Sequence, residues 1–160
     1  MSDAIILFSH GSLLCGAGET LRELAERIRA RGDAPIVEVG YLNYSEPTFE
    51  TAFERCVAAG ARRIMIAPYF LVAGKFVKVD LPRKIAAVRA RYPEVDVRVA
   101  AAMGYHPGLA DALLACAQRT APPSEWRRTL ETAGQFCRAD PRCPLYGSAA
   151  CRVTKEELAA

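Results

Sequence analysis

The strongest constraint on the fold is a regular alternation of short apolar runs and amphipathic segments between residues 4 and 119. The apolar runs are typical of strands buried on both faces of a parallel sheet. They comprise residues 4–9, 36–42, 63–71 and 95–101. The segments between and after them carry apolar residues at helical spacing. These predicted helices comprise residues 16–31, 45–60, 81–91 and 107–119. The pattern predicts an α/β fold with a four-stranded parallel sheet flanked by helices.

Two of the predicted helices carry specific expectations. The helix after residue 42 is expected to open at Ser45-Glu46-Pro47, with Pro47 in its first helical position. The last helix is expected to point its leucines inward, and these are Leu109, Leu113 and Leu114.

Right-handed crossovers place all loops that follow the strands at one edge of such a sheet, where ligands of these folds bind. Four segments are expected to meet there: 10–12, 43–46, 72–80 and 103–107. Both histidines of the chain, His10 and His106, fall in this set. The sequence therefore predicts a ligand site around His10.

Four side chains in these loops each allow a functional and a structural interpretation. His10 can offer a neutral ring nitrogen to a metal or accept a proton near pH 7, or can only bond a neighbouring loop. His106 precedes a helix start, where polar residues are common for structural reasons. Glu46 and Asp80 also precede helix starts, where they can support a ligand site or serve as caps that the helix dipole favours.

Charge and hydropathy exclude several classes of protein. The length of 160 residues suits one ordinary domain, and the net charge of +3 is spread among acids, which argues against nucleic-acid binding. No apolar run approaches the roughly 20 residues of a membrane helix, and the first residues lack the basic flank of a signal peptide. We therefore expect a cytoplasmic protein. One basic cluster, in residues 75–84, is either a solvated face or a site for an anionic ligand. Its members are Lys75, Lys78, Arg83 and Lys84.

The composition changes after Thr120, where Pro122 and Pro123 form a linker-like break. We expect an α/β domain over residues 1–120 and a cysteine-containing extension over 121–160, with one further helix at 126–136. The extension contains Cys137, Cys143 and Cys151. Their thiolates can bind an iron–sulfur cluster or Zn²⁺, form a disulfide, or remain reduced. We predict that the three lie close together and that at least two share a ligand or a bond.

Several motifs together resemble one family over roughly residues 4–118. They are LFSHGS at 7–12, VEVGYL at 37–42 followed by SEP at 45–47, APYFLVAGK at 67–75 with Val77, Asp80 and Pro82, and GYHP at 104–107. This set is similar to the small class II tetrapyrrole chelatases, the sirohydrochlorin cobaltochelatases and ferrochelatases.

The resemblance implies a three-layer chelatase-like (flavodoxin-like) fold and a lyase that inserts Co²⁺ or Fe²⁺ into sirohydrochlorin, on the routes to cobalamin and sirohaem. It also implies a homodimer, with His10 as metal ligand and proton acceptor. The residues expected to contact the tetrapyrrole are Ser12, Asn43, Glu46, Lys75, Phe76, Lys78 and Asp80.

The sequence departs from the family pattern at two site positions. Phe76 stands where the family has its second histidine, and Leu42-Asn43 stand where an acidic residue is frequent. Three explanations follow. His106 can substitute as the second metal ligand, or the carboxylates of the substrate can help deliver the metal. Alternatively, the protein is a non-catalytic tetrapyrrole- or metal-binding carrier or sensor, in which the Phe76 ring stacks on the macrocycle.

Overall fold

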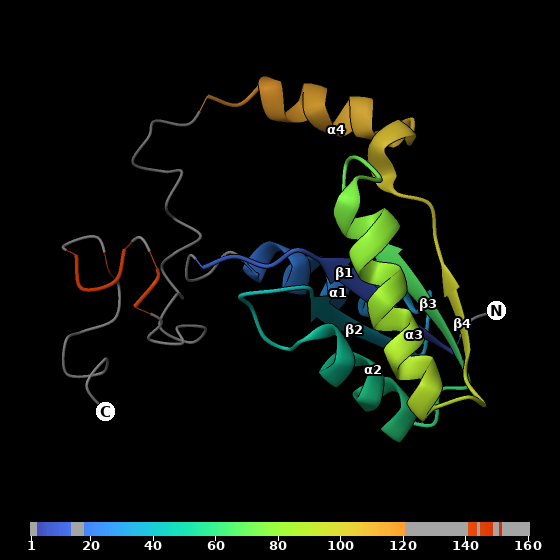
Figure 1. Cartoon of the computed structure of the whole chain (residues 1–160). Helices are drawn as coiled ribbons and strands as arrows, with labels where there is room; N and C mark the ends of the chain where they lie inside the picture. Colours follow the sequence, from blue (N-terminus) through green and yellow to red (C-terminus); the bar gives the residue numbers. More distant parts are fainter. Residues whose placement is uncertain (1–2, 14–17, 121–140, 144, 149–150, 152–160) are drawn as a thin grey trace.

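The computed structural model describes residues 3–13, 18–120, 141–143, 145–148 and 151 (Figure 1). The expected helix at 126–136, the linker before it and Cys137 lie outside these residues. The division into a domain and an extension therefore stays a prediction.

The centre of the fold is a parallel sheet of four strands, as predicted. The strands are β1 (Ala4–Ser9), β2 (Ile36–Tyr41), β3 (Arg63–Pro68) and β4 (Asp96–Val99). Their spatial order is β2-β1-β3-β4, so β1 lies inside the sheet between β2 and β3. The last two strands are shorter than expected. After Ala100 donates its N–H to Ile66 O at 2.8 Å, the chain leaves the sheet.

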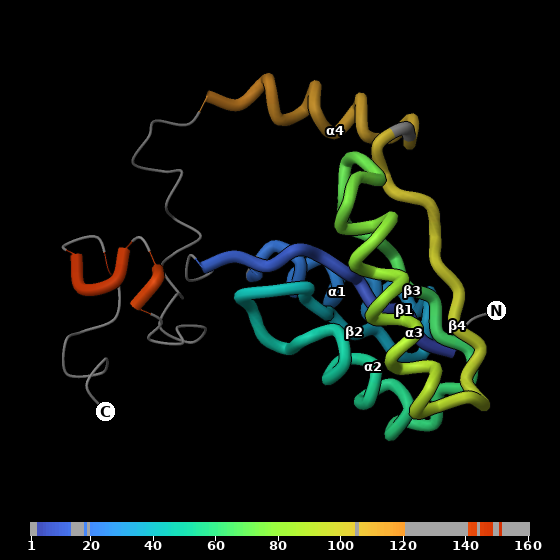
Figure 2. The backbone as a smooth tube through the Cα atoms, in the orientation of Figure 1, coloured from blue at the N-terminus to red at the C-terminus, as the bar shows by residue number. Residues whose placement is uncertain are grey.

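Helices cover the two faces of the sheet unequally (Figures 1 and 2). The helices are α1 (Glu19–Arg31), α2 (Phe49–Ala58), α3 (Leu81–Arg91) and α4 (Gly108–Ala117), with short helices η1 (Phe76–Asp80) and η2 (Met103–Tyr105). One face of β1, with Ile6 and Phe8, joins α2 and α3 in the larger core. The opposite face, with Leu7, packs against α1. Among the described residues no helix is long and apolar enough to cross a bilayer.

The start of α2 corrects one expectation. Pro47 does not occupy the first helical position, because α2 begins at Phe49 and Thr48 is its N-cap. The Thr48 hydroxyl accepts the backbone N–H of Thr51 at 3.2 Å, and this bond satisfies a donor that the first turn would otherwise leave unpaired. The side chain of Thr48 therefore decides where the helix begins.

Residues 72–80 also differ from the expected loop. Residues 76–80 form the π-helical turn η1, which leads directly into α3. Asp80 has helical dihedral angles and makes no side-chain capping bond, so it does not cap α3. Residues 76–91 are therefore helical throughout, and Phe76 and Asp80 lie on a helix and not in an irregular loop.

The prediction that the leucines of α4 point into the core is wrong. Leu113 and Leu114 are 61% and 63% exposed, and no residue of α4 is buried. The main contact of α4 is with η2, and Figure 1 shows the helix set apart from the sheet. Helical spacing correctly indicated an apolar face, but the chain after β4 does not carry that face back onto its own core.

Candidate functional site

The carboxyl ends of β1, β2 and β3 meet at one edge, as the topology predicts. After the end of β2 the Asn43 N–H donates to His10 O at 2.9 Å, and after the end of β3 the Tyr69 N–H donates to Phe8 O of β1 at 2.7 Å. His10 therefore lies between the loops that follow the two neighbouring strands.

Gly11 allows the first two loops to approach closely. Its φ of +85° lies in the left-handed region that glycine favours. A Cβ added at this position would lie 1.8 Å from Asn43 O, far inside van der Waals contact. The backbone contact that positions His10 beside Asn43 therefore depends on the absence of a side chain at residue 11.

The hydrogen bond of His10 determines which ring nitrogen can act. Its Nδ1 lies 3.1 Å from Gly11 O. A carbonyl oxygen can only accept, so in the neutral ring Nδ1 carries the proton and Nε2 carries the lone pair. That lone pair can bind a divalent cation or accept a proton, which are the two tasks expected of His10.

Two aromatic rings flank the His10 imidazole. The Phe76 ring is tilted by 42° with its centroid 4.4 Å from that of His10, and the Tyr44 ring stands edge-on at 5.7 Å. Both rings are partly exposed, at 37% for Phe76 and 38% for Tyr44. We call Tyr44 and Phe76 the aromatic pair. It gives the site a partly apolar surface that suits a planar ligand.

Ser45 ties together the loops after β1 and β2. The Ser12 N–H donates to Ser45 Oγ at 3.0 Å, Ser45 Oγ donates to Ser12 O at 3.3 Å, and the Ser45 N–H donates to Asn43 O at 2.7 Å. Sequence reasoning missed Ser45 and Tyr44 as site residues. Their position in the loop directly after β2 was the available signal.

The basic cluster divides in the structure. Lys75 and Lys78 are exposed on and beside η1, the helix that carries Phe76. Lys84 instead pairs with both carboxylate oxygens of Glu50 on α2, at 2.8 and 3.1 Å. Lys75 and Lys78 are therefore available to an anionic ligand near Phe76, and Arg83 is exposed on α3, whereas Lys84 ties α3 to α2.

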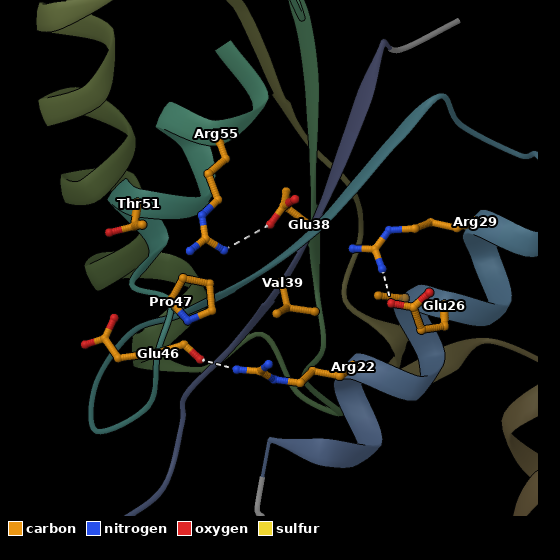
Figure 3. Close-up of a pocket in the computed structure, with 10 residues that line it drawn as sticks. Arg22, Glu26, Arg29, Glu38, Val39, Glu46, Pro47, Thr51 and Arg55 are labelled. Atoms are coloured by element: carbon orange, nitrogen blue, oxygen red, sulfur yellow. Dashed lines mark hydrogen bonds and ion pairs between the residues drawn. The ribbon is translucent and has the colours of Figure 1, made fainter. Parts of the chain in front are cut away.

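Glu46 lies apart from His10, in a groove of its own. Its Oε2 accepts the Thr48 N–H at 3.1 Å, next to the start of α2. It lines a groove of about 370 Å³ between α1 and α2, shown in Figure 3. The charged side chains of this groove are Arg22, Glu26, Arg29, Glu38, Glu46 and Arg55. Acids and bases balance there, and Arg55 reaches Glu38 at 3.7 Å. A net attraction for anions is therefore not expected in this groove.

His106 serves the start of α4. Its Nδ1 accepts the Gly108 N–H at 3.1 Å. Within the described residues the rings that contact the His10 imidazole are those of Tyr44 and Phe76, and the His106 ring is not one of them. Across the described part of the chain no three His, Cys, Asp or Glu residues are grouped closely enough to hold a metal ion. Pairing of His10 with His106 on a metal stays a prediction.

The cysteine prediction is also untested. Cys143 and Cys151 have free thiols, so no disulfide joins these two. Cys137 lies outside the described residues.

Comparisons with known proteins agree on one family. A family model described as CbiX matches residues 4–120. A sirohydrochlorin ferrochelatase of Priestia megaterium is 35% identical over 112 residues, covering 70% of this chain and 42% of the relative. A sirohydrochlorin cobaltochelatase of Methanocaldococcus jannaschii is 38% identical over 86 residues, covering 54% of this chain and 60% of the relative. The chain thus spans about half the length of these curated relatives.

Solved structures give the same result. The sirohydrochlorin chelatase SirB from Bacillus subtilis in complex with cobalt aligns with a TM-score of 0.69 and 29% identity, over 79% of this chain and 58% of that one. A Marinobacter aquaeolei protein described as CbiX aligns with a TM-score of 0.61 and 28% identity, over 78% of this chain and 98% of that one. The expected chelatase-like fold is confirmed.

Proposed function

The chain belongs to the CbiX family, and from this membership we propose that it is a lyase that inserts Co²⁺ or Fe²⁺ into sirohydrochlorin, on the routes to cobalamin and sirohaem. We further propose that it acts in the cytoplasm as a homodimer. The observation that supports the reaction is the position of the His10 imidazole directly after β1, where its Nδ1 lies 3.1 Å from Gly11 O, so that Nε2 carries the lone pair of the neutral ring.

Metal insertion requires a donor that replaces water on the cation and a base that takes protons from the pyrrole nitrogens. In the proposed reaction the single lone pair of His10 Nε2 first holds the cation and, once the cation has moved into the macrocycle, accepts one of the two pyrrole protons, while the other proton passes to water. The metal is a substrate here, so weak binding by few protein donors is compatible with its release into the macrocycle. His106 is the proposed second metal ligand.

The surroundings of His10 suit a planar, many-carboxylate substrate. The ring of Phe76, which is 37% exposed, offers a face for the macrocycle. The exposed ammonium groups of Lys75 and Lys78 can pair with its carboxylates. Ser12 and Asn43 are the proposed polar contacts from the first two loops, and Glu46 and Asp80 are supporting residues.

The test is an anaerobic assay of purified protein with sirohydrochlorin and either Co²⁺ or Fe²⁺, followed by absorption spectroscopy. The protein should change the spectrum faster than the uncatalysed mixture. The His10→Ala variant should lower the rate by about 100-fold or more, as expected for loss of a general base. The Arg98→Ala variant, which alters an exposed side chain of β4, is the matched control and should retain the rate. Equal rates with and without protein would overturn the proposal.

A second candidate function is a tetrapyrrole- or metal-binding carrier or sensor without turnover. The contact of Phe76 with His10 favours it, because an aromatic ring at that position can neither hold a cation nor accept a proton. This candidate predicts that sirohydrochlorin binds in equilibrium titrations while the insertion rate stays at the uncatalysed value.

A further inference from the structure

Tyr44 occupies a strained turn in the loop after β2. Its φ of +60° lies in the left-handed region, where residues with large side chains are uncommon. The Ser45 N–H donates to Asn43 O at 2.7 Å, so Tyr44 is the central residue of a γ-turn of the rare kind with positive φ. Such strain persists only where the surrounding structure enforces it, and it is concentrated at functional sites. A role for the Tyr44 ring beyond packing is therefore expected.

The Tyr44 ring lies beside a cation as well as beside His10. The guanidinium carbon of Arg142 is 6.0 Å from the centroid of the ring, within the range of a cation–π attraction. Figures 1 and 2 show residues 141–143 and 145–148 on the side of the molecule toward which the loop after β2 extends. A residue near the end of the sequence is therefore separated from the His10 imidazole by a single ring.

Each ring of the aromatic pair thus has a cation near it. Lys75 directly precedes Phe76, and the exposed Arg142 lies at the Tyr44 ring. This division suits a planar macrocycle, because carboxylates around its rim point in several directions. A guanidinium stays charged at neutral pH, and it can stack on an aromatic face while its N–H groups donate to a carboxylate. The chemistry of Arg142 therefore matches the rim of the proposed substrate.

We infer that Arg142 binds a carboxylate of the tetrapyrrole and that the Tyr44 ring positions its guanidinium beside His10. The segment around Arg142 then forms part of the ligand site. The inference rests on the proposed function, because it requires a ligand with several carboxylates at His10. Its experiments measure binding and proximity apart from metal insertion, so its failure is distinguishable from failure of the proposed function.

The first experiment titrates metal-free sirohydrochlorin into the whole chain and follows the absorption spectrum. Arg142→Ala should raise the Kd by about tenfold, the effect expected for loss of one charge-assisted hydrogen bond. The matched control is Arg31→Ala, which removes the same charge at the end of α1, at the opposite edge of the sheet, and it should leave the Kd unchanged. If the parent binds and Arg142→Ala binds equally well, the inference alone is overturned. If the parent does not bind sirohydrochlorin, the proposed function is overturned as well.

A double-mutant cycle with the same titration tests the role of Tyr44. Tyr44→Leu removes the ring that positions the guanidinium. In that background, adding Arg142→Ala should therefore raise the Kd by less than about threefold, because the two residues act as a unit. A full tenfold effect in the Tyr44→Leu background would show that the two residues act independently, and it would overturn the positioning by Tyr44.

The second experiment tests whether the segment around Arg142 reaches the site. The photoreactive residue p-benzoylphenylalanine replaces Tyr44, and light then links it to neighbouring groups. After trypsin digestion, mass spectrometry should find cross-links to the peptides 139–142 or 143–152, which meet at Arg142. The same probe in place of Arg31 is the control and should not give these cross-links. Cross-links from position 44 that are confined to residues 1–120 would mean that Arg142 does not lie at Tyr44, and they would overturn the inference.

Discussion

The ring of Phe76 packs against the imidazole of His10, with ring centroids 4.4 Å apart. The two residues come from η1 and from the loop after β1, and they are 66 positions apart in the chain. The family resemblance leads us to expect a second histidine at position 76, so this contact places the expected departure from the family pattern beside the proposed catalytic residue.

This contact predicts a gain of metal affinity. The Phe76→His variant puts a second imidazole beside His10, so it should bind Co²⁺ at least about tenfold more tightly, in keeping with the 10–100-fold effects of residues around metal sites. Isothermal titration without the tetrapyrrole measures this change. The Phe76→Leu variant removes the ring without adding a donor and should not tighten binding. If both variants bind Co²⁺ like the parent, Phe76 does not occupy a ligand position.

The backbone contact between the first two loops predicts a large cost for Gly11→Ala. A Cβ would meet Asn43 O at 1.8 Å, and φ of +85° disfavours any side chain. We expect the free energy of unfolding to fall by about 3 kcal/mol or more. Gly32→Ala is the control, since φ is +74° there but nothing lies within 4 Å, and it should cost only about 1–2 kcal/mol. Urea unfolding compares the two. Similar losses for both variants would show that the clash is relieved elsewhere.

Because of Asp3, we expect the free energy of unfolding to fall in acid. The hydrogen bond from the Arg63 side chain and the backbone N–H groups of Arg62 and Arg63 lower the pKa of Asp3 from 3.8 to about 2. Because the folded-state pKa is the lower one, this contribution is present above pH 3.8 and is lost as the pH falls toward 2.

The measurement is urea unfolding from pH 7 to pH 2. Asp3→Ala should be less stable than the parent at pH 7, and the difference should shrink below pH 4. Asp96→Ala, which removes another exposed carboxylate, controls for the change in net charge. A difference that persists at pH 2 would mean that Asp3 acts through packing and not through its charge.

Cysteine reactivity should follow burial. Desolvation, and secondarily the charge of Glu38, raise the pKa of the buried Cys56 thiol to about 12. Since the thiolate is the reactive form, iodoacetamide at pH 8 should label the exposed Cys116 quickly and leave Cys56 unlabelled in the folded protein. Peptide mass spectrometry reads both sites in one sample. Equal labelling would indicate that the core around Cys56 opens on the timescale of the reaction.

We predict that Cys137, Cys143 and Cys151 bind a metal together or that Cys137 forms a disulfide with one of the other two. Three cysteines lie within 15 residues that also contain Pro141 and Pro144, and short segments of this kind are commonly stabilised by metal or disulfide. Anaerobic purification with iron, sulfide and zinc analysis, and thiol counting under denaturing conditions, tests this. Six free thiols with no metal would refute it.

Much of the fold was predictable because period-2 and period-3.6 patterns are local properties of the chain. The bounds of β1 at Ala4–Ser9 and of α3 at Leu81–Arg91 agree with the apolar spacing. Right-handed parallel topology then placed the loops around His10 at one edge. Helix starts were less predictable, because the Thr48 hydroxyl takes the capping role that residues 45–47 were expected to fill.

By itself the sequence determined the order and type of the elements, the edge of the sheet at which the loops after the strands meet, and the presence of a histidine there. Only the tertiary structure decided which side chains touch His10, because contacts such as that with Phe76 join loops far apart in the chain. It also decided that the His106 ring accepts the N–H of Gly108, the first residue of α4, and that Leu113 and Leu114 are exposed. An amphipathic pattern indicates that a helix has an apolar side. It does not indicate which surface that side contacts, because this depends on where the preceding backbone positions the helix.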